Sequence, residues 1–121
     1  MLRYFEMAKA AAANSEHNFK HGAVLVRGGK VIAMSFNKTR HVSWMKSKSD
    51  FPSLHAEVGA LLNMPKDKTN GSDMYVCRIN RQGEYRMSKP CDMCRAAMAE
   101  MKVKRVYYTG PNGEFIKETI T

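Results

Sequence analysis

The sequence has no long apolar run, few cysteines and a shortage of acidic residues. None of its apolar stretches approaches the roughly 20 residues of a transmembrane helix, so we expect no membrane partner. Glu6 and Lys9 interrupt the first hydrophobic stretch, which argues against a secretory signal there. Three cysteines are an odd number, which does not suit a disulfide framework and favours reduced thiols. We therefore expect an intracellular protein, unless the chain is a fragment of a delivered toxin.

The shortage of acidic residues leaves the chain strongly basic. Against 20 Lys and Arg there are 11 Asp and Glu, which gives a formal net charge of +9 and favours polyanionic partners, nucleic acid first. The chain also has no repeat, low-complexity tract or linker, and 121 residues is the size of one domain. We therefore expect a single domain over residues 1–121.

The hydrophobic pattern predicts helices that alternate with strands. Helices are expected at 2–13, from a cap at Ser53 to Leu62, and from Pro90 to Met101, and strands at 23–26, 31–34, 74–79, 103–108 and 114–120. Residues 65–72 are expected to break the second helix. This order favours an α/β fold with a mixed five-stranded sheet covered by helices on both faces.

Cys91 and Cys94 stand three residues apart near the expected start of a helix. They would share one helix face there, and the helix dipole would favour the thiolate form that binds metal. The spacing alone also fits a redox pair or half of a structural zinc finger. The remaining cysteine, Cys77, lies in an apolar strand and is predicted to be a core residue, so a third ligand must come from elsewhere.

His55 and Glu57 open the other predicted helix. The His55 imidazole is the natural third ligand, and three protein ligands leave one position of a tetrahedral zinc open, as in catalytic sites. Zinc lowers the pKa of water there toward 7, and Glu57 is free to carry protons. Residues i and i+2 point roughly 200° apart on an ideal helix, so both side chains reach one point only at the helix end.

The segments 55–57 (His-Ala-Glu) and 90–94 (Pro-Cys-Asp-Met-Cys) resemble the signature of the zinc-dependent cytidine/deoxycytidylate deaminase superfamily. The first hairpin and the strands around the second metal helix are similar as well, so the resemblance covers nearly the whole chain. It implies a three-layer cytidine-deaminase-like fold with zinc at the N-termini of two helices. It also implies hydrolytic deamination of cytosine to uracil, with His55, Cys91 and Cys94 as zinc ligands and Glu57 as the catalytic proton carrier.

The resemblance implies substrate contacts as well. Asn37 stands where many members carry a sugar-contacting asparagine, and the Ala56 N–H with the carbonyl of Ser88 or Cys77 would read the pyrimidine edge. Outside the motif, His21 is the best histidine for a substrate contact, although a structural role is commoner for such a residue.

Two features distinguish this chain from parts of the superfamily. Lys89 stands where many nucleotide- and tRNA-type members place Glu before Pro-Cys. The turn at 111–113 predicts that the last two strands are antiparallel. That arrangement resembles the division of cytidine deaminases and bacterial deaminase toxins and weakens an adenosine-on-tRNA interpretation.

Two groups of basic residues indicate how a substrate strand could be held. The first group lies in one loop around the only tryptophan and comprises Lys38, Arg40, Lys46 and Lys48 with Trp44; the second leads into the metal helix and comprises Arg78, Arg81, Arg86 and Lys89. Such side chains neutralise phosphates while an aromatic ring stacks on a base. A solvated loop with its tryptophan packed on the body is the alternative.

The sequence therefore predicts a zinc-dependent deaminase of cytosine in nucleic acid, single- or double-stranded, with DNA ahead of RNA. The alternative substrate is a free cytidine or deoxycytidine nucleoside or nucleotide. A third hypothesis is a nucleic-acid-binding module with a purely structural zinc, against which Glu57 argues because such a site has no use for a free carboxylate. The oligomeric state is left open.

Overall fold

The structure is a computed structural model that describes residues 2–15, 20–37, 55–62 and 64–120. Within these residues the helices are α1 (Leu2–Ala12), α3 (Ala56–Leu61), α4 (Lys66–Thr69) and α5 (Asp92–Glu100). The strands are β1 (Lys20–Arg27), β2 (Lys30–Phe36), β3 (Asp73–Ile79), β4 (Tyr85–Arg86), β5 (Arg105–Thr109) and β6 (Phe115–Thr119). Every helix in this part of the chain is too short or too polar to cross a membrane.

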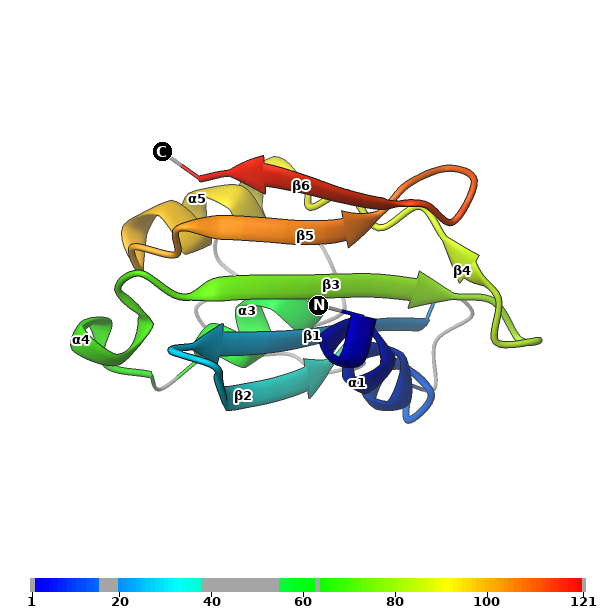
Figure 1. The fold of residues 1–121 in the computed structure, drawn as a ribbon, viewed down its shortest axis with the longest axis horizontal. Coiled ribbons are helices and arrows are strands. Elements are labelled where there is room, and N and C mark those ends of the chain that lie inside the picture. The colour runs from blue at the N-terminus through cyan, green and yellow to red at the C-terminus, as the bar shows by residue number, and fades with distance from the viewer. Residues whose placement is uncertain (1, 16–19, 38–54, 63, 121) are drawn as a thin grey trace, which may run out of the picture.

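The strands form one mixed sheet in the order β2-β1-β3-β5-β6, with β4 paired to β3 (Figure 1). The pair β3–β5 is parallel and the others are antiparallel, including β5–β6 as the turn at 111–113 predicts. The mixed sheet is confirmed, but it has six strands instead of five. The extra strand, β4, has only two residues, which is too short to show an alternating pattern in the sequence.

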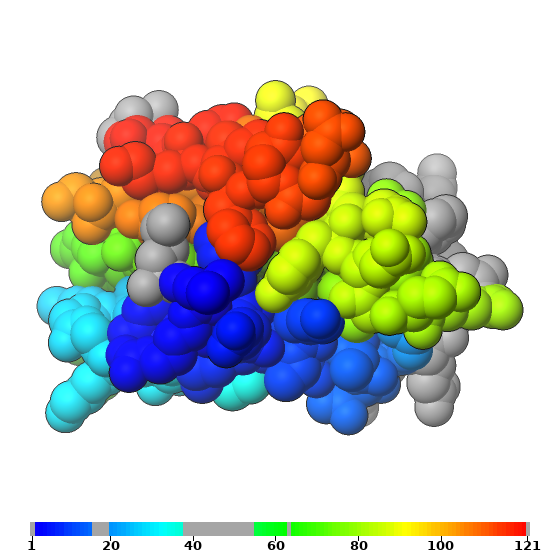
Figure 2. All heavy atoms as spheres, turned by 45° about the vertical axis from the view of Figure 1, so that its right-hand side comes forward, coloured from blue at the N-terminus to red at the C-terminus, as the bar shows by residue number. Residues whose placement is uncertain are grey.

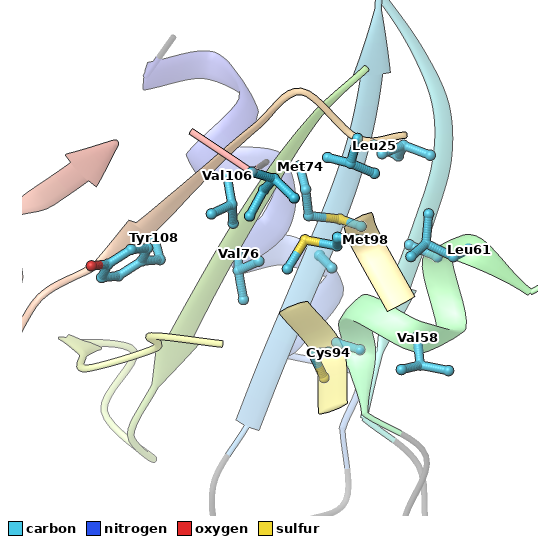
Figure 3. Packing of buried hydrophobic residues seen from close by; sticks show 14 residues of the cluster. Leu25, Val58, Leu61, Met74, Val76, Cys94, Met98, Val106 and Tyr108 are labelled. Carbon is cyan, nitrogen blue, oxygen red and sulfur yellow. The ribbon is translucent and has the colours of Figure 1, made fainter. Parts of the chain in front are cut away.

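Helices cover both faces of this sheet and give it two separate hydrophobic clusters. In Figure 1, α1 lies in front of the sheet, and α3 and α5 lie behind it. On β3, Tyr75 and Cys77 pack in the α1 cluster, whereas Met74 and Val76 pack with α3 and α5 (Figure 3). Cys77 is thus a core residue as predicted, and burial raises its pKa to about 12. The three-layer arrangement is confirmed.

The two metal helices begin later than the sequence indicated. The N-cap of α3 is His55 rather than Ser53, and the N-cap of α5 is Cys91, so that Pro90 precedes the helix. Residues 65–72 were expected only to end the second helix, but they include the short helix α4. These shifts place His55 and Cys91 on extended backbone at the start of a helix, where their side chains can turn toward a common point.

Gly22 allows α1 to lie directly on β1. A Cβ at this position would come within 1.9 Å of the Ala8 carbonyl oxygen and 2.7 Å of the Ala12 nitrogen. We expect Gly22→Ala to lower the free energy of unfolding by roughly 1–3 kcal/mol, because helix and strand must separate. Urea denaturation measures this. Ala99→Ser, on the exposed side of α5, should change stability by less than about 0.5 kcal/mol. Equal urea midpoints for Gly22→Ala and the unmodified chain would contradict the prediction.

Candidate metal centre and active site

Three side chains meet where α3 and α5 begin. His55 and Cys91 are the N-caps of these helices, and both have extended backbone, with φ −67° and ψ 145° for His55 and φ −72° and ψ 169° for Cys91. Cys94 follows in the first turn of α5, at the position toward which an N-cap side chain normally reaches. The two cysteines therefore meet because Cys91 lies just outside the helix and Cys94 in its first turn, although the Cys91 side chain makes no capping hydrogen bond.

The distances among these side chains fit a zinc ion. The Nδ1 atom of His55 lies 3.3 Å from the Sγ of Cys94 and 3.6 Å from the Sγ of Cys91, and all three atoms lie within 4.8 Å of one another. A tetrahedral zinc with ordinary bond lengths would hold a nitrogen and a sulfur about 3.6 Å apart. Among the described residues this is the one such group of potential ligands found. The expectation of zinc as cofactor is confirmed.

Burial sets the protonation of the group. It lowers the pKa of His55, which favours the neutral imidazole whose lone pair can bind metal. Burial also raises the pKa of the Cys94 thiol, with the nearby Glu57 carboxyl as a second cause. Cys94 therefore keeps its proton in the absence of metal, and zinc supplies the positive charge that removes it.

Glu57 lies beside this group, almost fully buried at 4% exposure. Burial raises the pKa of its carboxyl, and hydrogen bonding from its own backbone N–H and from the Cys94 thiol opposes the shift. His55 is the N-cap and lies outside the helical turns of α3. Its side chain therefore need not point roughly 200° away from that of Glu57, as residues i and i+2 do within an ideal helix, and both can approach Cys94.

Asn37 and His21 are joined to each other at the end of the β1–β2 hairpin. The Asn37 Oδ1 accepts a hydrogen bond from the His21 backbone N–H at 2.9 Å, and the Asn37 N–H donates to the His21 carbonyl at 3.2 Å. The Ser15 hydroxyl donates to the Asn37 carbonyl at 3.0 Å. Asn37 is thus buried and fixed in place, and its contact with a sugar stays a prediction.

Ser88 is also held by the protein itself. Its hydroxyl donates to the Val76 carbonyl at 3.1 Å and accepts from the Thr109 N–H at 2.8 Å, while its own N–H donates to the Thr109 carbonyl at 2.8 Å. These bonds fix the segment before Cys91 to β3 and β5. No sequence pattern indicated Thr109, which is fully buried, because its role depends on a contact between residues 21 positions apart. Ala56 is fully buried next to Glu57, and its reading of a base stays a prediction.

The strand register brings three basic side chains to the same face as the metal group. His21 on β1 pairs with Arg78 on β3, which pairs in turn with Arg86 on β4. Residues two apart on a strand point to the same face of the sheet. Ala23, two residues from His21, and Val76, two residues from Arg78, pack with α3 and α5, so His21 and Arg78 lie on that face as well. Arg86 is exposed and forms an ion pair with Glu84 at 3.4 Å; Lys89 is exposed two residues before Cys91. The candidate nucleic-acid contacts Lys38, Arg40, Lys46 and Lys48, with Trp44, lie outside the described residues.

The comparisons with known proteins agree with this geometry. Residues 1–110 match the family described as the cytidine and deoxycytidylate deaminase zinc-binding region. The tRNA-specific adenosine deaminase of Agrobacterium fabrum is 29% identical over 102 residues, which are 84% of this chain and 59% of that protein. The chain thus spans less than two thirds of that relative's length.

Solved structures share the fold. The dCMP deaminase of cyanophage S-TIM5, in apo form, is 26% identical with a TM-score of 0.64, over 91% of this chain and 82% of that one. The cytidine deaminase of Burkholderia pseudomallei is 23% identical with a TM-score of 0.71, over 98% and 91% of the two chains, and supports the fold. The resemblance in the sequence is confirmed. The chain belongs to the cytidine and deoxycytidylate deaminase zinc-binding family.

Proposed function

We propose that this chain deaminates cytosine to uracil hydrolytically, with zinc held by His55, Cys91 and Cys94 and with Glu57 as the catalytic residue. The observation that carries the proposal is the buried Glu57 carboxyl next to the Cys94 thiol, which lies 3.3 Å from the Nδ1 of His55. A purely structural zinc has no use for a carboxyl group at that place, which argues against a binding module with a structural metal.

The chemistry follows from what each residue can do. Zinc in such a site lowers the pKa of a water molecule toward 7. Glu57 accepts the proton that this water loses and delivers it to the cytosine ring nitrogen N3, then assists proton transfer to the departing amino group at C4. Water and cytosine thus become uracil and ammonia, with no redox step. The buried position of Glu57 keeps its carboxyl away from bulk water during the transfer.

Nucleic acid is the preferred substrate in this proposal, with DNA ahead of RNA. The net charge of +9 and the exposed Arg86 and Lys89 next to the metal helix support it. Free cytidine or deoxycytidine nucleotides are the alternative, supported by the likeness to the dCMP deaminase of S-TIM5. The antiparallel β5–β6 pair supports cytosine over adenosine, although the Agrobacterium relative is named for adenosine in tRNA.

An assay of zinc-loaded protein at low salt distinguishes these substrates. Cytidine, dCMP, a single-stranded oligonucleotide with one cytosine, its duplex, and an RNA oligonucleotide with one adenosine are incubated in parallel, and uracil or inosine is measured by mass spectrometry. We expect uracil in the oligonucleotides, formed faster than from the monomers. Uracil from monomers alone would overturn the preference for nucleic acid, and inosine without uracil would overturn cytosine as the substrate.

A further inference from the structure

A hollow of about 550 Å³ lies between α1, the start of β1 and the turn that joins β3 to β4. Its lining includes Glu6, Lys9, Lys20, Ile79, Arg81 and Gln82. We call it the α1 groove. Figure 2 shows its two walls, the blue helix α1 and the yellow-green β3–β4 turn, side by side on one face of the molecule. Among the described residues of the lining, Lys9, Lys20 and Arg81 stand against one acidic residue, Glu6, so the groove favours an anion.

Two of the basic side chains are held in defined positions. The Nζ of Lys9 lies 5.3 Å from the centroid of the Tyr85 ring, a distance at which ring and cation attract each other. The Nζ of Lys20 donates a hydrogen bond to the Ser15 carbonyl at 2.5 Å. An ammonium group has three donors, so each lysine keeps others for a ligand. Positioned charges lose less side-chain entropy on binding than mobile ones.

The opposite wall is a turn with internal hydrogen bonds. The Asn80 Oδ1 accepts the backbone N–H groups of Gln82 at 3.0 Å and Glu84 at 2.9 Å, and its Nδ2 donates to the Glu84 carboxylate at 2.8 Å. Gly83 has a φ of +81°, which this turn requires and which other residues rarely adopt. A Cβ on Gly83 would lie 3.8 Å from the Lys9 side chain, so turn and helix are close neighbours.

The α1 groove and the candidate active site lie at the same end of the sheet, on opposite faces. Lys20 pairs with Ile79, which packs in the α1 cluster, whereas the next pair, His21 with Arg78, faces the metal side. Layers packed on a sheet lie about 10 Å apart, and a nucleic-acid strand carries one phosphate per about 3.4 Å of duplex axis. A few nucleotides are therefore enough to pass from one face to the other around this end.

We propose that the α1 groove binds the phosphates of a single-stranded polynucleotide next to the base that occupies the active site. The inference rests on the proposed function and names its substrate class. A single nucleotide in the active site is too small to reach the other face, so only a polymer uses the groove. Lys9, Lys20 and Arg81 pair with phosphates.

The test measures binding separately from catalysis. A fluorescent oligo(dT), which contains no cytosine, is titrated with zinc-loaded protein at 50–200 mM salt and followed by anisotropy. Three phosphate contacts on a single strand contribute a slope of about −2 to the plot of log K against log salt, or about a 20-fold loss over this range. We expect the triple variant Lys9→Gln, Lys20→Gln, Arg81→Gln to bind at least tenfold more weakly at 50 mM salt, with a slope about 2 units shallower.

A matched variant removes the same charge elsewhere. Lys66→Gln, Lys68→Gln, Lys104→Gln changes three exposed lysines of α4 and of the segment before β5, none of which lines the α1 groove. It should weaken oligo(dT) binding less than threefold. Equal losses of oligo(dT) affinity in both triple variants would contradict phosphate binding in the α1 groove, because the change in net charge alone would explain them. An unchanged salt slope in the first variant would also overturn it.

Monomer turnover separates this inference from the proposed function. Deamination of deoxycytidine should remain within twofold in both triple variants, since neither changes the active site. If the first variant fails to fold, Arg81→Gln alone keeps the test valid, with an expected slope change of about 0.7. Suppose that oligo(dT) binds with the expected salt slope but that no cytosine is deaminated. This result would support phosphate binding in the α1 groove and contradict the proposed function.

Discussion

Glu57→Gln is expected to lower cytosine turnover by about 10²- to 10⁴-fold while one zinc per chain stays bound. Glutamine has nearly the same shape and can keep a hydrogen bond to Cys94, but it cannot carry a proton. Because burial already raises the pKa of Glu57, the neutral amide replaces a group whose charged form is disfavoured there. We therefore expect the variant to fold normally, and kcat rather than KM to fall.

Glu100→Gln is the matched control, since Glu100 is an exposed residue of α5 away from the metal group. It should keep both zinc and turnover. Turnover is measured by uracil formation and zinc by elemental analysis of the purified variants. A Glu57→Gln variant that turns over at the rate of the unmodified chain would show that another group moves the protons.

The metal group could be predicted from sequence because its signals are local. Three potential ligands next to two predicted helix starts, with a carboxylate two residues from one of them, suffice without knowledge of the sheet. The exact helix ends could not be predicted, because Ser53 and Pro90 are both good residues for a helix start and the structure uses His55 and Cys91 instead. That shift is what allows the His55 and Glu57 side chains to converge on Cys94.

The grouping of the basic residues was predicted only in part. Arg78, Arg81 and Arg86 form one cluster in the sequence, but strand register divides it. Arg78 and Arg86 pair on the face of the metal group, whereas Arg81 in the intervening turn lines the α1 groove with Lys9 and Lys20. Residues of α1 and the start of β1 build that groove together with the β3–β4 turn, which is far from them in the sequence. Sequence spacing gives no measure of such contacts, because β-strand pairing joins distant residues.

Cys94→Ser is expected to abolish stoichiometric zinc binding and the stabilisation that zinc gives to the fold. Cys94 is fully buried, lies 3.3 Å from His55 and packs with Met98 and Val58 in the cluster under α3 and α5 (Figure 3). Serine has a similar shape, but its hydroxyl is a far poorer zinc ligand than a thiolate. A ligand present at 1,000 times its Kd stabilises the folded state by about 4 kcal/mol, so removal of zinc from the unmodified chain should lower its Tm by roughly 10–20 °C.

The sharpest form of the experiment compares the two buried cysteines. Thermal unfolding is recorded with saturating zinc and with excess chelator for the unmodified chain, Cys94→Ser and Cys77→Ala. Cys77 packs on the other face of the sheet, so Cys77→Ala lowers the Tm in both conditions but keeps the difference between them. Cys94→Ser should lose the difference. The two variants remove similar sulfur atoms from two separate clusters. If chelator lowers the Tm of Cys77→Ala but not that of Cys94→Ser, a metal at the start of α5 explains the difference. A zinc-dependent Tm retained by Cys94→Ser would contradict the ligand assignment.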